Sequence, residues 1–296
     1  MRGRYALLHR FALATLALSV LLAACAGHRI EPIPAWPLHT VQVDDAQLAY
    51  RVAGTGPPLL LIMGYAGTMD IWDATFVARL AKTRRVILFD NRNMGHSTAS
   101  DASASMERMA RDTLGLIQAL GLDRPDVLGW SMGSIIAQEM ALARPDAVGK
   151  LVLYGSACEA GPVLEAVDRM RALSHERFMA ELFPAEWARR NSDVFARLPN
   201  PALPPSPEAL ASQREGLRQW AGTTDRLPGL RGPVLLLVGE EDAITLVQQS
   251  VTMAGLIRGA WLARFDGGGH WLMYQNPEAM ADVVETFLRT RQDLLD

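Results

Sequence analysis

The sequence has few cysteines, no excess of basic charge and no dinucleotide-binding signature, and each shortage excludes a class of protein. Two cysteines among 296 residues cannot form a disulfide framework or a zinc site built from cysteines. Lys and Arg number 29 against 32 Asp and Glu, so the chain has no electrostatic footprint for nucleic acid. No glycine-rich fingerprint follows a predicted strand, so neither a nicotinamide nor a flavin is implied. With 49% hydrophobic residues, the chain can instead bury one large core or two modest ones.

The first 24 residues have the composition of an export signal. They contain three arginines and no acidic residue, and a weakly polar-to-apolar run from Phe11 to Ala24 is short for a membrane span. Removing this segment takes the net charge from −3 to −6, by loss of the three arginines. An acidic body does not bind anionic lipid by charge, so any membrane attachment must come from another source.

The end of this signal, Leu22-Ala23-Ala24-Cys25, resembles the lipobox of bacterial lipoproteins. The resemblance implies cleavage before Cys25, lipidation of its thiol, and an envelope protein anchored in the membrane (outer membrane or periplasm in a Gram-negative cell). The alternative is ordinary cleavage after Ala24-Cys25-Ala26, which discards the cysteine. Prolines at 32, 34 and 37 predict an extended tether over residues 25–38, which would span roughly 40 Å.

Short apolar strands alternate with amphipathic helices through most of the remaining chain, which predicts an α/β fold. A hairpin is expected first, around Asp44-Asp45. Buried strands are predicted at Leu59–Met63, Arg85–Asp90, Asp126–Trp130, Leu151–Tyr154, Val234–Gly239 and Ala260–Phe265. Helices are predicted at Ile71–Lys82, Met106–Leu120, Met132–Ala143, Leu246–Ile257 and from Pro277 to about Thr290. This order favours a mostly parallel sheet with helices on both faces.

The alternation stops over residues 156–230, where only helices are predicted. Four helical stretches are expected, at Val163–Leu173, Glu176–Leu182, Glu186–Arg197 and Glu208–Trp220. A helical insertion between strands predicts a cap over the strand ends, with residues 39–155 and 231–296 as the core. Apolar cap residues either line an acyl pocket or pack the cap onto the core; they are Met170, Leu173, Phe178, Met179, Phe183 and Trp187.

The sequence Gly129-Trp130-Ser131-Met132-Gly133 follows a predicted buried strand and opens a predicted helix. The glycines permit a sharp turn that presents the serine hydroxyl at the helix amino terminus, where backbone N–H groups and the helix dipole favour negative charge. By itself the pattern is weak, because chance produces it in roughly one chain in ten of this composition. Its position between strand and helix makes Ser131 the candidate nucleophile.

A serine nucleophile needs a base, and His270 is the leading candidate. It follows three glycines directly after the last predicted strand. Loops after the carboxyl ends of parallel strands share one crevice, so Ser131 and His270 are expected to meet there. His96, in the polar loop after another strand, is the rival base, although packing within that loop is its expected role.

An orienting carboxylate and an oxyanion hole complete the expected site. Asp242 stands three residues past the end of strand Val234–Gly239; Glu240, Glu241 and Glu159 are the alternatives. The backbone N–H of Met132, directly after the serine, is the first expected oxyanion donor. The second is the N–H of Tyr65, in the loop after strand Leu59–Met63. A plain strand-to-helix turn would be the alternative role of that loop.

These features resemble the α/β-hydrolase superfamily over roughly residues 40–290. The chain order Ser131, Asp242, His270 is that of the superfamily, and Asp90-x-Arg92-x-x-Gly95-x-Ser97 resembles its structural loop after the fourth strand. Asp90 is therefore expected to be structural and not a nucleophile. One departure is Met63-Gly64, where many members have His-Gly; this removes an imidazole that buttresses the loop but leaves a backbone donor in place.

The resemblance implies a serine hydrolase in which Ser131 is the nucleophile, His270 the general base and acid, and Asp242 the orienting residue. We expect cleavage of a carboxylic ester with a small or medium acyl group through an acyl-enzyme. The alternatives are C–C, amide or peptide, and peracid chemistry with the same triad, or a non-catalytic lipoprotein scaffold. No metal or cofactor is required. The expected partners are a small acyl substrate and the membrane; the sequence carries no signal for the oligomeric state.

Overall fold

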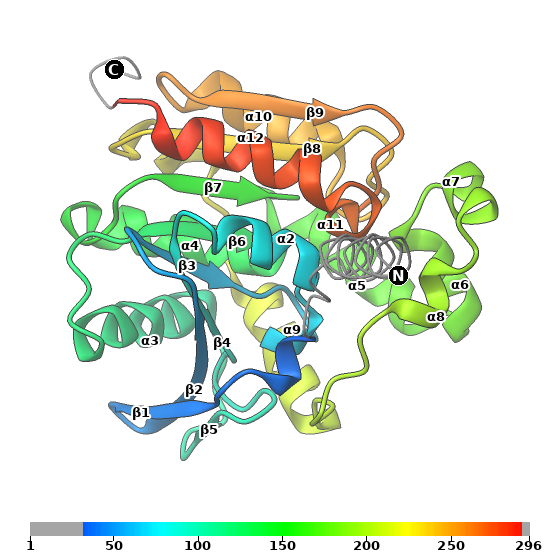
Figure 1. Cartoon of the computed structure of the whole chain (residues 1–296). Coiled ribbons are helices and arrows are strands. Elements are labelled where there is room, and N and C mark those ends of the chain that lie inside the picture. Colours follow the sequence, from blue (N-terminus) through cyan, green and yellow to red (C-terminus); the bar gives the residue numbers. More distant parts are fainter. Residues whose placement is uncertain (1–31, 292–296) are drawn as a thin grey trace, which may run out of the picture. The chain divides into compact units, whose positions relative to one another are not determined.

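The computed structural model describes residues 32–291, and the predicted signal segment with Cys25 lies outside the described residues. Within this part of the chain, a sheet of nine strands runs in the order β1-β2-β4-β3-β6-β7-β8-β9, with β5 paired to β2 (Figure 1). Its strands are β1 (His39–Val43), β2 (Ala46–Ala53), β3 (Pro58–Ile62), β4 (Arg85–Phe89), β5 (Thr98–Ala99), β6 (Asp126–Trp130), β7 (Leu151–Tyr154), β8 (Val234–Gly239) and β9 (Trp261–Phe265). The predicted strands are confirmed to within a residue at each end, and β5 is an addition.

Six strands, from β4 to β9 along this order, pair in parallel, whereas β1, β2 and β5 are antiparallel to their neighbours. The central parallel strands are continuous apolar runs because helices cover both of their faces. In the register of β3 and β6, Ile62 lies opposite Gly129. The loop after β3 therefore starts beside the turn that carries Ser131.

Helices cover the sheet on both faces. Cores on the two faces include Met109, Ile136 and Met253 on one side, and Phe76 and Val284 on the other. The flanking helices are α2 (Ala74–Leu80), α3 (Met106–Ala119), α4 (Met132–Ala143), α10 (Val247–Leu256), α11 (Leu272–Gln275) and α12 (Pro277–Arg289), with short 3-10 turns η2 (Met69–Ile71) and η3 (Pro145–Ala147). None of the helices in residues 32–291 is both long and apolar enough for a membrane span.

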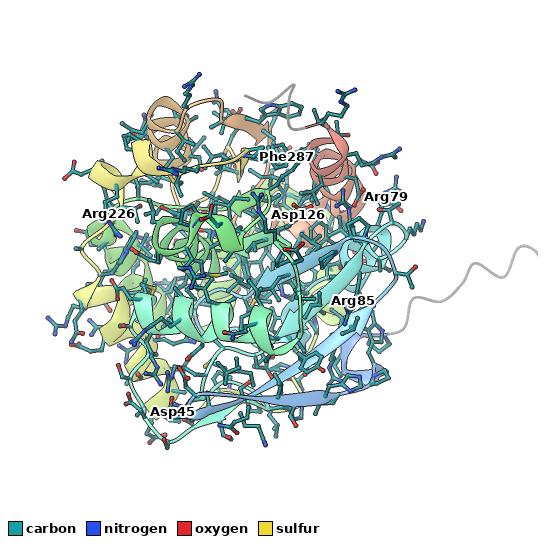
Figure 2. The ribbon with its side chains drawn as sticks, turned by 90° about the vertical axis from the view of Figure 1, so that its left-hand side faces the viewer. Asp45, Arg79, Arg85, Asp126, Arg226 and Phe287 are labelled. Carbon is teal, nitrogen blue, oxygen red and sulfur yellow. The ribbon has the colours of Figure 1, made fainter. Side chains whose placement is uncertain are left out.

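Polar groups connect the amino ends of three parallel strands, at the opposite end of these strands from Ser131. Asp126, at the start of β6 (Figure 2), pairs with Arg84 at 3.0 Å and accepts a hydrogen bond from the Lys150 N–H at 2.9 Å. Burial raises the pKa of Asp126 despite these partners. These contacts link the beginnings of β4, β6 and β7. The carboxyl ends of the same strands take no part in them and are available for a functional site.

Residues 156–230 contain five α-helices and no strand. They are α5 (Ala160–Arg171), α6 (His175–Leu182), α7 (Ala185–Arg190), α8 (Val194–Arg197) and α9 (Pro207–Gln219), followed by the 3-10 turn η4 (Thr224–Gly229). The single helix predicted over Glu186–Arg197 is wrong, because the chain turns between α7 and α8. The helix predicted from Ile71 likewise begins later, where the Asp73 carboxylate accepts a hydrogen bond from the Phe76 N–H at 2.7 Å and caps α2.

The extended tether predicted over residues 25–38 is wrong for its second half. Residues Ile33–Ala35 form a 3-10 turn, η1, and the Ile33 side chain is 1% exposed in the core. Pro34 is compatible with this turn because the first residues of a helical turn need no N–H donor. Arg51 also donates a hydrogen bond to the carbonyl of Trp36. Residues from Ile33 to Ala35 therefore belong to the folded domain and not to a tether.

Candidate active site

Ser131 lies in a sharp turn between β6 and α4. Its φ of 54° and ψ of −123° are unusual for a residue with a side chain, and such backbone strain costs on the order of 1–3 kcal/mol. Both motif glycines are sterically required. A Cβ on Gly129 would lie 2.3 Å from the Gly133 carbonyl oxygen, and a Cβ on Gly133 would lie 2.1 Å from that of Ile62. The turn holds Ser131 in the wall of a pocket.

His270 and Asp242 form a buried pair beside this turn. The His270 Nδ1 lies 2.8 Å from Asp242 Oδ2, to which it donates as the N–H tautomer. Asp242 Oδ1 accepts from the backbone N–H groups of Ile244 and Thr245, each at 2.8 Å, and Oδ2 also accepts from the Thr245 hydroxyl at 2.8 Å. The carboxylate is therefore fixed, and the tautomer leaves His270 Nε2 as an acceptor.

The backbone of His270 is fixed as well. Its carbonyl accepts a hydrogen bond from the Tyr154 hydroxyl at 2.6 Å and a second from Trp130 Nε1 at 3.3 Å. Burial raises the pKa of Tyr154 well above its usual value, so the phenol stays protonated as a donor. Gly155, with φ of +53°, passes so close that a Cβ there would lie 3.4 Å from His270 Cε1. The ends of β6, β7, β8 and β9 thus converge on the His270 ring.

The two predicted oxyanion donors lie in the same pocket. Met132 is the first residue of α4, so its N–H has no partner within the helix. The loop after β3 approaches closely, since a Cβ on Gly64 would lie 3.0 Å from the Ser131 Cβ. Tyr65 follows Gly64 in this loop, and both Tyr65 and Met132 line the pocket together with Ser131 and His270. The loop and helix end can therefore present two N–H groups to one side of Ser131.

Sequence reasoning missed two residues that hold this loop. Asn91 donates from Nδ2 to the Met63 carbonyl at 3.1 Å, which buttresses the loop where many superfamily members have an imidazole. Gln213 of α9 accepts a hydrogen bond from the Ala66 N–H at 3.0 Å, and Ala66 has a positive φ of 61°. No local pattern identifies Gln213, because its partner is 147 residues away.

The alternative site residues lie elsewhere. The His96 N–H donates to Asp90 Oδ2 at 2.8 Å, and His96 is not among the described residues that line the pocket. Glu240 pairs with Arg264 at the surface, and Glu159 accepts from Gln249. The third alternative, Glu241, is exposed.

Asp90 is buried within its own loop. Its Oδ1 accepts from the Met69 N–H at 2.7 Å, and burial raises its pKa to about 6. These contacts hold the start of η2 and the Asp90–Ser97 loop in place.

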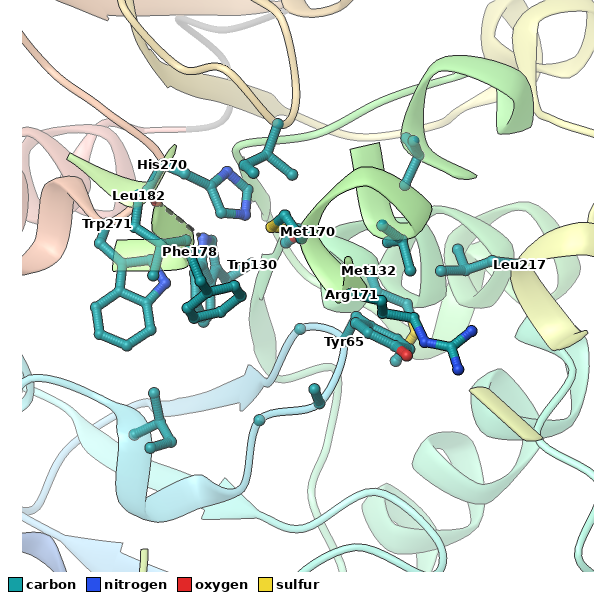
Figure 3. A pocket seen from close by; sticks show the side chains of 18 of the residues that line it. Tyr65, Trp130, Met132, Met170, Arg171, Phe178, Leu182, Leu217, His270 and Trp271 are labelled. Atoms are coloured by element: carbon teal, nitrogen blue, oxygen red, sulfur yellow. Dashed lines mark hydrogen bonds between the residues drawn. The ribbon is translucent and has the colours of Figure 1, made fainter. Parts of the chain in front are cut away.

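The pocket is a cavity of about 400 Å³, within the range of small-molecule sites. Figure 3 shows His270, Trp130 and Trp271 toward one end and Tyr65, Arg171 and Leu217 toward the other. Its helical wall comes from α5, α6 and α9 and is mainly apolar, with Val163, Val167, Met170, Phe178, Leu182, Leu210 and Leu217. No three His, Cys, Asp or Glu side chains in the described part of the chain are placed to hold a metal ion.

Of the six cap residues named from the sequence, two line the pocket, three others belong to or pack against an apolar cluster, and Leu173 does neither. Met170 and Phe178 line the pocket, which was one of the two roles expected for these apolar residues. Met179 and Phe183 do not line the pocket and belong to an adjoining apolar cluster, against which Trp187 and Phe178 pack. The Phe183 and Trp271 rings also meet edge to face, with centroids 5.9 Å apart. The second cluster therefore fastens the helical segment to the residue that follows His270.

Comparisons with known proteins agree with this architecture. The family described as alpha/beta hydrolase fold matches residues 57–203. A putative carbamate hydrolase of Azorhizobium caulinodans is 28% identical over 82% of this chain and 95% of its own. A 2-hydroxymuconate semialdehyde hydrolase of Pseudomonas putida is 29% identical over 79% and 88%. A thermophilic esterase from Thermogutta terrifontis superimposes with a TM-score of 0.75 at 26% identity, over 86% of this chain and 98% of that one. The predicted fold is confirmed.

Proposed function

We propose that this chain, a member of the α/β-hydrolase superfamily, is an esterase that hydrolyses carboxylic esters through an acyl-enzyme on Ser131. The observation that carries the proposal is the His270–Asp242 pair, 2.8 Å apart, in the wall of the same apolar cavity as Ser131. A fixed imidazole that shares a cavity with a strained serine is the arrangement expected of a hydroxyl activated for attack on a carbonyl.

In the proposed reaction, Ser131 Oγ attacks the ester carbonyl while His270 Nε2 takes the hydroxyl proton. The N–H groups of Tyr65 and Met132 donate to the resulting oxyanion. The imidazolium, stabilised by Asp242, then gives its proton to the leaving alcohol oxygen. A water molecule, deprotonated by His270, attacks the acyl-enzyme, and collapse of the second intermediate returns the proton to Ser131.

The cavity supports a small or medium acyl group. Its volume of about 400 Å³ is at the lower end of ligand sites, and its helical wall offers aliphatic and thioether side chains. Burying an acyl chain there contributes about 0.8 kcal/mol for each methylene removed from water. Affinity should therefore rise with chain length until the cavity is full.

A second candidate reaction uses the same residues on a different carbonyl bond. Two of the relatives are named for other substrates, a carbamate and a 2-hydroxymuconate semialdehyde. Attack by Ser131 would be common to an ester, a carbamate and a C–C bond next to a carbonyl. The leaving group that His270 must protonate differs among them.

We further propose that the protein is exported and anchored through a lipid on Cys25. The support is the sequence Leu22-Ala23-Ala24-Cys25 after a basic and apolar signal segment. Because Ile33–Ala35 form a turn with Ile33 buried in the core, the segment available as a tether shrinks to residues 25–32, which would span roughly 25 Å at about 3.1 Å per residue. Cys25→Ser should move the protein from the membrane fraction to the soluble fraction, and retention would argue against lipidation.

The test of the esterase activity is a panel of p-nitrophenyl esters of increasing acyl length, with wild type and Ser131→Ala. We expect a rise and then a fall in kcat/KM with chain length, and loss of nearly all activity in the variant. Labelling by a fluorophosphonate, present in wild type and absent from Ser131→Ala, checks the nucleophile without assuming a substrate. Equal rates or equal labelling of the two proteins would refute the proposal.

A further inference from the structure

One charged side chain stands in the otherwise apolar and uncharged wall of the helical segment. Among the described residues that line the cavity, Arg171 is the only one with a permanent charge. It ends α5, and three other residues of that helix, Val163, Val167 and Met170, line the same cavity. An acyl chain lying along α5 would therefore meet apolar side chains first and a guanidinium afterwards.

Two neighbouring arginines form salt bridges within the protein, whereas Arg171 forms none among the described residues and acts on Asp168, the carboxylate that Arg214 holds, only through its charge. Arg169, two residues earlier, pairs with Glu181 at 3.1 Å and donates to the Ala243 carbonyl at 2.8 Å. Arg214 of α9 holds the Asp168 carboxylate with two hydrogen bonds, at 2.5 and 2.7 Å. Arg171 makes no salt bridge with any residue between 32 and 291 in this structure. Its five N–H donors remain available to a bound anion.

Arg171 lies on the far side of Tyr65 from the catalytic histidine. Figure 3 shows its guanidinium beyond the Tyr65 ring, at the end of the pocket opposite Trp271. The two side chains also interact electrostatically, since the positive charge of Arg171 acts to lower the pKa of the Tyr65 hydroxyl while burial raises it. If the reacting carbonyl sits at the Tyr65 N–H, a straight acyl chain that passes the Tyr65 ring ends at Arg171.

We propose that Arg171 binds an anionic group at the far end of the acyl chain, so that the preferred esters carry a terminal carboxylate on the acyl side. This inference rests on the proposed esterase function. A planar guanidinium binds a carboxylate through two parallel hydrogen bonds, which gives direction as well as affinity. Because Arg171 is exposed, solvent weakens the pair, and we expect a preference of about two- to fivefold.

The experiment compares mono-p-nitrophenyl adipate with its neutral methyl ester in wild type, Arg171→Gln, Arg171→Glu and the control Arg169→Gln. We expect the ratio of kcat/KM for the acid over the methyl ester to fall about two- to fivefold in Arg171→Gln. It should fall further in Arg171→Glu, while the Arg169→Gln ratio stays equal to that of wild type. In wild type the ratio should also fall at high salt, because the pair is solvent-screened.

Three outcomes would overturn the inference. A ratio that is unchanged in Arg171→Gln and Arg171→Glu would show that the guanidinium does not bind the carboxylate, while hydrolysis of the methyl ester would leave the esterase proposal standing. An equal fall in Arg169→Gln would show a diffuse field effect instead of a binding contact. Hydrolysis of neither ester by wild type would overturn both proposals together.

Discussion

The hydrogen bond between Gln213 and Ala66 predicts that helix α9 of the helical segment positions one donor of the proposed oxyanion hole. Gln213 is 1% exposed on α9, and its Oε1 accepts from the Ala66 N–H at 3.0 Å. A second contact joins the same loop to α9, where the Tyr65 hydroxyl donates to the Leu210 carbonyl at 3.4 Å. The proposed donor N–H of Tyr65 therefore stands in a loop that α9 holds in place.

Gln213→Met removes the acceptor and keeps much of the side-chain volume. The Ala66 N–H then loses a buried partner, which costs on the order of 1–3 kcal/mol. Ala66 is already in the left-handed region, so its loop has a strained conformation to relax from. The Gln213 Nε2 is buried without a hydrogen-bond partner, so its removal loses no further bond. We expect kcat to fall about tenfold, equivalent to about 1.4 kcal/mol, with KM within about twofold of wild type.

The assay is steady-state kinetics on p-nitrophenyl butyrate, with thermal unfolding to check that the variant is folded. A trifluoromethyl ketone, which adds to the serine and carries an oxyanion, should bind more weakly by the same factor as kcat falls. The control is Gln219→Met, on the exposed side of α9 and bonded only to Glu215 among the described residues. An unchanged kcat in a folded Gln213→Met protein, or the same loss in the control, would refute the reasoning.

Two further predictions follow from buried carboxyl groups. Asp242→Asn should lower kcat by about 10³-fold or more with little change in Tm. The amide oxygen can keep the hydrogen bonds from the Ile244 and Thr245 N–H groups, so the Nδ2 donors face His270 and fix the wrong tautomer of its ring. A kcat within tenfold of wild type would contradict this prediction. Asp90 has a folded pKa of about 6 against 3.8 for the free group, so the folded state binds the extra proton and stability falls as pH rises between these values. In urea unfolding, the free energy of unfolding of wild type minus that of Asp90→Asn should therefore be larger at pH 4 than at pH 7, by up to about 3 kcal/mol. The same difference at both pH values would be inconsistent with a raised pKa of the buried carboxyl group.

Local patterns predicted the elements of the site, because each functional candidate stands where a strand ends. Ser131 follows β6 between two glycines that the backbone packing requires, and His270 follows β9 after three glycines. The register of parallel strands then brings their carboxyl ends to one edge. Asp242 is the one acid of its loop that is buried, and the sequence favoured it because of its distance past β8.

Contacts between segments far apart in the chain could not be predicted from the sequence. Periodicity shows that α6 is amphipathic, but it does not say which apolar residue meets the cavity and which meets a neighbouring helix. Phe178 faces the cavity, whereas Met179, the next residue, packs in the cluster with Phe183. The same holds for Asn91, whose loop was recognised from its motif but whose bond to Met63 depends on the meeting of two strand ends.

The prolines before β1 show how a correct local rule led to a wrong tertiary prediction. Pro34 does exclude an interior α-helical position, but a single 3-10 turn places it in the first turn, where its missing N–H is not needed. Burial of Ile33 then stabilises the folded turn over an extended tether, since removing a large aliphatic side chain from water contributes about 1.5–3 kcal/mol. That gain offsets much of the entropy of ordering the few residues of the turn. A sequence rule that counts prolines cannot see it, because the apolar surface that receives Ile33 is built by residues far along the chain, including Phe76 and Leu80 of α2.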